Sequence, residues 1–514
     1  MYIMSCNKSM SFEECERAIL KKAIEESKRK QGKKMLMNDE TLKIINIVES
    51  FIKDKKCICY GGTAINNILP EEEKFYDKQV EFPDYDFYTP HALKYAKELA
   101  DIYYKHGFTE VEAKAGVHKG TFKVYVNFLP VADITFLPVD LYKELLKDSK
   151  KVENIYYAPP NFLRMSMYLE LSRPDGDTSR WEKVLKRITL LNKHYPLKGK
   201  QCTLKNIQRI FSKSEIKSVD VFTIIRDTFV NNNVVFFGSY ALKLYSRYMP
   251  KKIEENFRKI PDFDVLAEDP ELMAYRLKEQ LNYGGYKNVE IIKHEGVGEI
   301  ISDHIEIKVE DKTVVFIYKP IACHSYNIAD TKIGKIRIAT IDTMLSFYLA
   351  FMYANREYYK KNRILCMCEF LFNVQQENRL EQKGLLKRFS IECYGKQHTL
   401  EESRKEKSEK YKELKNKKNT SEYDEYFLRY VPFEIKKDDE IRRETLRKSK
   451  TKSKQLSTKQ VSTKLQNLSK PKTRTKTNSK TIEYTVVPKK KTRKKKKPKK
   501  KPKKKKGVLG FLFD

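Results

Sequence analysis

The clearest hydrophobic pattern in the chain is a short apolar run that changes to helical spacing at a pair of glycines. Residues 57–60 are apolar or aromatic, and Gly61, Gly62 and Thr63 follow directly. From there to Leu69 the apolar positions recur at helical spacing, which predicts a helix. A glycine pair lets the backbone turn tightly, and a helix start offers free N–H groups and a positive dipole end to an anion. The pattern therefore predicts a strand, a turn and a helix that could cradle a phosphate.

Two later apolar runs carry carboxylates on predicted strands. Residues 81–89 hold Asp84 and Asp86, and residues 131–136 hold Asp133. Because strand side chains alternate between faces, Asp84 and Asp86 emerge on the same face. Asp133 completes a three-carboxylate cluster if the two strands lie side by side. An isolated Asp-x-Asp is common by chance. The ordered combination of strand, glycine turn, helix, Asp-x-Asp and a later strand aspartate occurs by chance far less often, and it predicts a divalent-metal site for nucleotidyl transfer.

The same pattern recurs in the second half of the chain. A strand-like run ends in Gly238 and Ser239, and Asp262 and Asp264 follow as a second Asp-x-Asp. The offset between the copies is 176 from Gly62 to Gly238 and 178 at the carboxylates. So nearly constant an offset indicates a duplicated unit.

The second copy lacks an obvious third carboxylate. Aligning Pro138 with Pro320 places Val315 where the first copy has Asp133. Glu306 and Glu310 are the two acids that could substitute. We therefore predict catalysis in the first copy and a degenerate second lobe that is structural or binds RNA.

The motifs resemble those of the polymerase-β-type nucleotidyltransferase superfamily, and most closely the poly(A) polymerase catalytic subunits of large cytoplasmic and giant DNA viruses. The resemblance covers most of residues 40–380. It is carried by four segments: Tyr60-Gly-Gly-Thr-Ala-Ile65, Pro83-Asp-Tyr-Asp-Phe87, Val131-Ala-Asp-Ile134 and Ser172-Arg-Pro-Asp-Gly-Asp-Thr-Ser-Arg-Trp-Glu-Lys183.

This resemblance implies an α+β fold of two tandem nucleotidyltransferase-like lobes, each a mixed sheet with helices. It implies template-independent transfer of AMP from ATP to RNA 3′ ends, with two Mg²⁺ or Mn²⁺ ions on the three aspartates. Gly61, Gly62 and Thr63 would hold the triphosphate. Arg180 and Lys183 would face nucleotide or RNA phosphate, although a solvated basic helix face is the plainer interpretation.

Two other functions stay open at this point. The motifs alone also fit another RNA terminal nucleotidyltransferase, uridylyl- or oligoadenylate-forming, and a catalytically dead RNA-binding processivity scaffold. Viral relatives further imply either a heterodimer with a partner or a self-sufficient homodimer, and the large second lobe and the basic tail favour the homodimer. They also imply the host cytoplasm (viral factory) and the virion.

Charge divides the 514-residue chain sharply. Residues 436–514 contain 31 Lys and Arg against 6 Asp and Glu, out of a net charge of +35 for the whole chain. Such a Ser-, Thr- and Lys-rich tail is expected to be disordered and to bind RNA phosphates without sequence preference. The predicted division is a catalytic lobe at 1–200, a degenerate lobe at 201–400, a charged linker with a last packed segment at 401–435, and the tail.

The nine cysteines show neither disulfide nor zinc spacing. The pairs Cys57/Cys59 and Cys366/Cys368 fall in apolar runs, so core thiols and an intracellular reducing compartment are expected. No apolar run is long enough to cross a membrane, and no signal peptide is expected.

Overall fold

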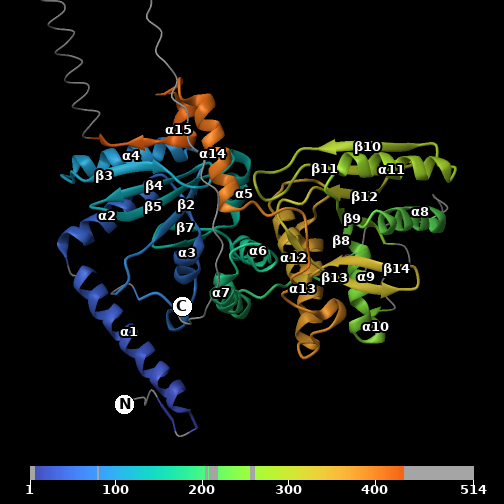
Figure 1. The fold of residues 1–514 in the computed structure, drawn as a ribbon, viewed down its shortest axis with the longest axis horizontal. Coiled ribbons are helices and arrows are strands. Elements are labelled where there is room, and N and C mark those ends of the chain that lie inside the picture. Colours follow the sequence, from blue (N-terminus) through green and yellow to red (C-terminus); the bar gives the residue numbers. More distant parts are fainter. Residues whose placement is uncertain are drawn as a thin grey trace, which may run out of the picture. The chain divides into compact units, whose positions relative to one another are not determined.

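The computed structural model describes residues 6–7, 9–36, 38–77, 80–202, 207, 218–254, 261–418 and 420–432. Two eight-stranded mixed sheets, each with its helices, form one unit of residues 1–440 (Figure 1). The expected two-lobed α+β fold is confirmed. The predicted Lys-rich tail lies outside the described residues, and the predicted domain boundaries stay predictions.

The first sheet contains the predicted carboxylate strands as neighbours. Its strands are β1 (Ile58–Cys59), β2 (Tyr85–Thr89), β3 (Val111–Ala115), β4 (Thr121–Val126), β5 (Leu129–Phe136), β6 (Lys150–Val152), β7 (Ile155–Tyr157) and β16 (Arg429–Tyr430). They follow the order β16-β3-β4-β5-β2-β1-β7-β6. Strand β2, which carries Asp86, pairs in parallel with β5, which carries Asp133, so the two strands are direct neighbours.

The second sheet repeats the topology of the first. Its strands are β8 (Val235–Phe236), β9 (Phe263–Leu266), β10 (Val289–His294), β11 (His304–Val309), β12 (Lys312–Tyr318), β13 (His324–Thr331), β14 (Gly334–Ala339) and β15 (Cys393–Tyr394). In the order β10-β11-β12-β9-β8-β14-β13, the succession of parallel and antiparallel pairs equals that of β3-β4-β5-β2-β1-β7-β6. The duplication inferred from the spacing is therefore present in the fold.

Helices cover the sheets and join the lobes. They are α1 (Phe12–Leu36), α2 (Asp39–Asp54), α3 (Gly61–Ile68), α4 (Ala92–Lys105), α5 (Val139–Asp148), α6 (Pro160–Leu171), α7 (Trp181–His194), α8 (Ser218–Asn231), α9 (Ser239–Tyr245), α10 (Lys251–Glu254), α11 (Pro270–Tyr283), α12 (Ile341–Phe351), α13 (Lys361–Glu377), α14 (Leu400–Leu414) and α15 (Ser421–Phe427). Helix α2 buries Ile44, Val48 and Ile52 in the core of the first lobe, whereas α1 leaves Phe12 and Leu20 exposed.

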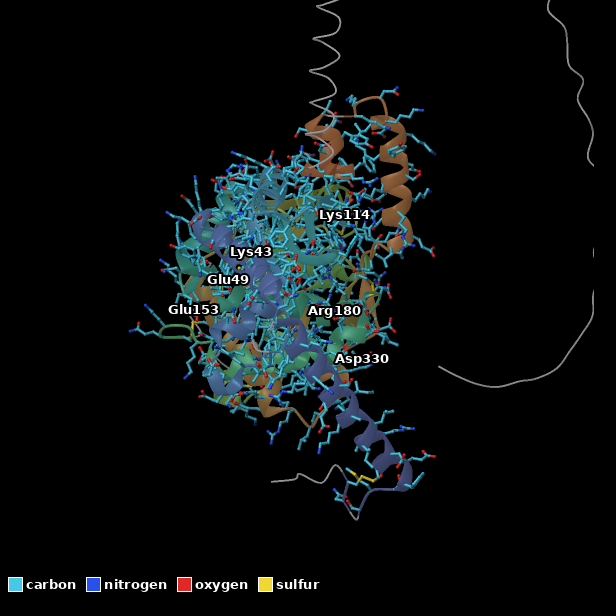
Figure 2. All side chains as sticks on the ribbon, turned by 90° about the vertical axis from the view of Figure 1, so that its left-hand side faces the viewer. Lys43, Glu49, Lys114, Glu153, Arg180 and Asp330 are labelled. Carbon is cyan, nitrogen blue, oxygen red and sulfur yellow. A yellow bond between two sulfur atoms is a disulfide. The ribbon has the colours of Figure 1, made fainter. Side chains whose placement is uncertain are left out.

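Contacts between the lobes are extensive. Helix α6 of the first lobe packs on α12 of the second, and the Phe162 ring meets the Tyr353 ring edge-on at 5.3 Å. The chain then returns to the first lobe through α14 and α15, and β16 pairs with β3 so that Arg429 lies opposite Lys114; Lys114 is labelled in Figure 2. The part of 401–435 predicted as a last packed segment therefore adds a strand to the first sheet, and the charged part before it forms α14.

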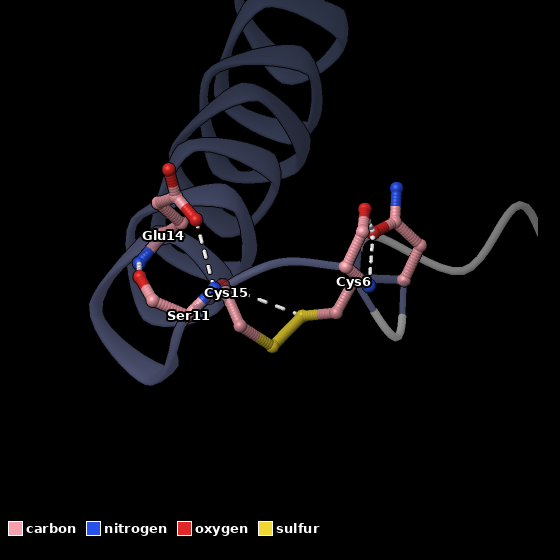
Figure 3. Close-up of a disulfide and its surroundings, with 6 residues drawn as sticks. Cys6, Ser11, Glu14 and Cys15 are labelled. Atoms are coloured by element: carbon pink, nitrogen blue, oxygen red, sulfur yellow. Dashed lines mark hydrogen bonds between the residues drawn. A yellow bond between two sulfur atoms is a disulfide. The ribbon is translucent and has the colours of Figure 1, made fainter.

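Three disulfides correct the expectation that the cysteines are free thiols. Cys6 pairs with Cys15 at the start of α1 (Figure 3), Cys202 with Cys366, and Cys323 with Cys393. Cys57, Cys59 and Cys368 are free and buried, as expected. In two of the disulfides the partners are 164 and 70 residues apart and meet only through the fold, whereas Cys6 and Cys15 are nine residues apart. The expectation of a reducing compartment was based on free thiols, so the three disulfides remove its basis.

In the described part of the chain, no helix is both long enough and apolar enough to cross a membrane.

Arg164 of α6 connects this helix to the C-terminal end of α7 by hydrogen bonds. Its side chain is fully buried and donates hydrogen bonds to the Asn192 side chain at 2.7 Å, to the Leu191 carbonyl at 3.1 Å, to the Tyr195 carbonyl and to Asn161. Removing the guanidinium leaves several buried acceptors without donors, at about 1–3 kcal/mol each.

We predict that Arg164→Met lowers the free energy of unfolding by about 3 kcal/mol or more, measured by urea denaturation. The matched control is Lys186→Met on α7, whose side chain is 73% exposed and which should change stability by less than about 0.5 kcal/mol. Equal effects of the two substitutions would contradict the role of Arg164 in connecting α6 to α7.

Candidate active site

The glycine turn is fitted closely around Asp86. Gly61 has φ +73°, in the left-handed region that favours glycine, and a Cβ added there would lie 2.6 Å from Asp86 Oδ2. The Tyr60 N–H donates to the Asp86 carbonyl at 2.9 Å. Backbone and side chain of Asp86 are therefore both held against the start of α3, and Gly61 is required for this approach.

Strand register brings Asp86 and Asp133 together, whereas Asp84, predicted on the same strand as Asp86, lies just before β2 begins. Asp86 lies directly opposite Asp133 in the parallel pair β2–β5, and Asp84 lies two residues before Asp86. Lys123 lies opposite Asp133 on β4 and forms an ion pair with its carboxylate. Sequence alone predicted the three aspartates; it did not predict the lysine that partly neutralises them.

Burial and neighbouring carboxylates raise the pKa values of Asp84 and Asp86. Burial, followed by the charges of Asp84 and Asp133, raises the pKa of Asp86 to about 7. Burial and the charge of Asp133 also raise the pKa of Asp84, against the opposing effects of Lys123 and Lys183. The site is therefore short of positive charge, which is the condition that a bound cation relieves.

The donor set fits a hard divalent cation, but the cage is not preformed. Two oxygens on one Mg²⁺ lie at most about 4.2 Å apart, twice the usual metal–oxygen distance. Within the described part of the chain, the one group of three candidate ligands that all lie within 4.8 Å of one another is Asp175, Cys323 and Cys393, and these two cysteines form a disulfide. A shared ion on the three aspartates therefore requires side-chain rotation, such as release of Asp133 from Lys123.

Arg187 is a candidate phosphate ligand that sequence reasoning did not select. A Cβ added at Gly62 would lie 2.7 Å from Arg187 Nη2 and 2.6 Å from the Tyr76 hydroxyl, so both groups cover the start of α3. Arg187 donates to Tyr76, and Asn66 of α3 accepts hydrogen bonds from the backbone N–H groups of Phe75 and Tyr76 at 2.8 Å each. Helical spacing placed Arg187 on the basic face of α7, but only the fold shows that it reaches the glycine turn.

The other predicted phosphate ligands lie around this centre with partners of their own. The Thr63 hydroxyl donates to the Asp84 carbonyl at 2.7 Å, so it fixes the carboxylate segment. Arg180 forms an ion pair with Glu170 at 3.1 Å. Lys183 lies within electrostatic range of Asp84, and its pKa is lowered, chiefly by the neighbouring charge of Arg187.

The equivalent place in the second lobe is closed and lacks the third acid. Gly238 approaches Asp264 as Gly61 approaches Asp86, so the structural offset at the glycine is 177 and not 176. Opposite Asp264 on β12 stands Phe316; Val315, the residue predicted there, lies opposite Phe263. The predicted loss of the third carboxylate holds, with the residue displaced by one.

Neither proposed substitute restores a carboxylate cluster. Glu306 lies one strand beyond Phe316, hydrogen-bonds to His294 at 2.8 Å and accepts a hydrogen bond from Thr313. Glu310 is exposed in the β11–β12 turn. Tyr358 stacks on Phe316 at 5.0 Å and fills this face of the sheet.

Comparison with known proteins agrees with this geometry. Residues 46–177, which contain the glycine turn and the three aspartates, match the model of the family described as "Poly(A) polymerase catalytic subunit". The resemblance to that family is confirmed. A putative poly(A) polymerase catalytic subunit of Acanthamoeba polyphaga mimivirus is 26% identical over 222 residues, which cover 41% of this chain and 36% of the relative.

Two further similarities concern African swine fever virus and Megavirus. A putative poly(A) polymerase catalytic subunit of African swine fever virus (strain Badajoz 1971 Vero-adapted) is 31% identical over 159 residues, 30% of this chain and 33% of the relative. The crystal structure of the Megavirus polyadenylate synthase matches with a TM-score of 0.67 at 21% identity and covers 84% of this chain and 89% of that chain, which supports the fold. The chain spans about a third of the length of the curated relatives that it matches.

The raised pKa of Asp86 predicts a pH-dependent stability. An unfolded aspartate ionises near pH 3.8 and Asp86 near pH 7, so the folded chain holds the extra proton between these values and its stability falls as pH rises through them. Without divalent ions, Asp86→Asn should therefore raise the free energy of unfolding at pH 8 by about 4 kcal/mol, measured by urea denaturation.

At pH 4 the substituted and unsubstituted proteins should be nearly equally stable, which provides the internal control. A stabilisation of equal size at pH 4 and pH 8 would show that the effect comes from packing and not from the ionisation of Asp86.

Proposed function

We propose that the chain is a polynucleotide adenylyltransferase that adds AMP from ATP to RNA 3′ ends without a template. The observation that carries the proposal is the strand register that sets Asp86 beside Asp133, against the glycine turn at Gly61. Nucleotidyl transfer needs this combination of a phosphate cradle and adjacent carboxylates. The names of the viral relatives and the net charge of +35 support ATP and RNA as substrates.

Residues of the first lobe would divide the work. Two divalent cations on Asp84, Asp86 and Asp133 would supply activation of the RNA 3′-oxygen and stabilisation of the departing pyrophosphate. The first N–H groups of α3 and the Arg187 guanidinium would bind the triphosphate in the orientation for attack. Lys123 would hold the Asp133 carboxylate in its orientation until the substrates are bound.

In the reaction, the RNA 3′-oxygen forms a bond to the α-phosphorus of ATP while the bond from that phosphorus to the pyrophosphate oxygen breaks. The hydroxyl proton passes to solvent, and AMP is left joined through a phosphodiester. The choice between Mg²⁺ and Mn²⁺, a homodimer and presence in the virion stay predictions.

Paired substitutions in the two lobes test the proposal. Asp84→Ala/Asp86→Ala should reduce kcat for extension of an oligoadenylate primer by at least about a thousandfold, because the lost groups act on charge that develops in the transition state. Asp262→Ala/Asp264→Ala is the matched pair in the second lobe and should retain turnover once folding is verified. Loss of activity only in the second pair would reverse the assignment.

The same assay separates the alternatives. Extension with UTP in preference to ATP would favour the uridylyl-forming enzyme. Absence of extension by the unsubstituted protein with either Mg²⁺ or Mn²⁺ would favour the RNA-binding scaffold.

Arg187 provides a second test on the donor side. Arg187→Ala should raise the KM for ATP by about tenfold or more, since a charge-assisted hydrogen bond to phosphate contributes about 1.5–3 kcal/mol. Lys186→Ala on the same helix, whose side chain pairs with Glu182 at 2.8 Å, should leave the KM unchanged. Equal values for the two variants would remove Arg187 from the triphosphate site.

A further inference from the structure

A cavity of about 330 Å³ opens beside the carboxylates, between α2, α3 and the segment that leads into β2. We name it the α2–α3 cavity. Asp84 and Thr63 line it at the catalytic end, and Ile45 and Glu49 of α2 line it on the opposite side. Its volume falls in the range of small-ligand sites. The cavity therefore connects with the reacting centre and could accept a nucleoside.

Its walls are aromatic, polar and acidic. The aromatic lining residues are Tyr76, Phe82, Tyr85 and Tyr157, and the acidic ones are Glu49, Glu81, Asp84 and Glu153. Among the described residues that line it, there is no lysine or arginine. Flat apolar rings suit a nucleobase, whereas carboxylates repel phosphate.

Hydrogen bonds hold the polar groups of the cavity in place. The Tyr85 hydroxyl donates to Glu49 Oε1 at 2.6 Å, and Asn67 Nδ2 donates to the Tyr157 hydroxyl at 2.9 Å. The other carboxylate oxygen of Glu49, Oε2, pairs with Lys53 of α2 at 3.5 Å, so both oxygens of this side chain are held in place. The cavity therefore offers fixed hydrogen-bonding groups between apolar rings, as ligand sites do.

Two cations contact residues that line the cavity, since Arg187 donates to the Tyr76 hydroxyl and Lys53 pairs with Glu49. Arg187 covers Gly62, and Lys123 pairs with Asp133. Figure 2 shows Glu49 and Glu153 well apart from Arg180. A triphosphate is thus drawn to Arg187 and Lys123, and a group with little phosphate charge to the cavity.

We propose that the α2–α3 cavity binds the 3′-terminal nucleoside of the acceptor RNA. This inference rests on the proposed function, since it locates the second substrate of that reaction. The terminal nucleoside carries a free hydroxyl and no phosphate at its 3′ end, so its base can enter an acidic cavity. Asp84 at the mouth then lies on the side from which the 3′-oxygen must reach the donor.

Filling the cavity tests this placement. Ile45→Trp puts an indole into the space, and Asn46→Trp, on the exposed side of the same helix, is the matched control. Ile45→Trp should raise the KM for an oligoadenylate acceptor by about tenfold, or about 1.4 kcal/mol, and leave the KM for ATP unchanged. Asn46→Trp should change neither constant.

A conservative second variant guards against misfolding. Glu49→Gln keeps the shape of the side chain and should raise the acceptor KM by about threefold through weaker acceptance of hydrogen bonds. A rise in the KM for ATP alone would assign the cavity to the donor base and overturn the proposal. An unchanged acceptor KM in both variants would also overturn it.

Equilibrium binding separates this inference from the proposed function. The probe is a fluorescent oligoadenylate with the full chain, read by anisotropy without turnover. If the unsubstituted protein does not extend RNA, the proposed function fails. The acceptor site is still supported if Ile45→Trp binds the probe more weakly than Asn46→Trp, and is refuted if the two bind equally.

Discussion

The close approach of the half-buried Asp86 to Asp84 and Asp133 is the constraint on which the first lobe depends. Burial, followed by the charges of Asp84 and Asp133, raises the pKa of Asp86 to about 7. Ionised Asp86 is therefore unfavourable in the folded chain, and the paired strands β2 and β5 hold it beside Asp133. Gly61 allows Asp86 to approach the turn, and Lys123 offsets part of the charge at Asp133. Groups whose pKa is strongly shifted in this way are typical of functional sites.

The second lobe has the same strand arrangement without a third carboxylate. Phe316 replaces the third carboxylate in the strand register, and His304 contacts Tyr358 through a hydrogen bond of 2.9 Å. Burial lowers the pKa of His304 to about 4, so its ring is uncharged at neutral pH. Aromatic packing therefore occupies the position that a carboxylate holds in the first lobe.

Local patterns predicted the elements, and tertiary contacts decided the details. Alternation placed Asp84 and Asp86 on one face, and the glycine pair marked the turn. The prolines that aligned Val315 with Asp133 lie beyond the strands, where loops tolerate insertion, so the register was wrong by one residue. The contact of Arg187 with Tyr76 and the disulfides Cys202–Cys366 and Cys323–Cys393 join segments that are distant in sequence, and no local spacing encodes such proximity.

The second lobe contacts the first lobe at the start of the basic helix α7, and these contacts give a physical reason for its retention. The backbone N–H of Ser325 donates to the Ser172 carbonyl at 2.8 Å, and the Phe389 ring meets Trp181 at 5.7 Å. These contacts fix the segment between α6 and α7, which ends at Arg180 and leads into the helix that carries Arg187. Because a long cationic side chain loses conformational entropy when it is held, a rigid support lowers the entropy still to be lost when an anion binds it. Contacts with the second lobe therefore reach the start of the basic helix and hold it in place.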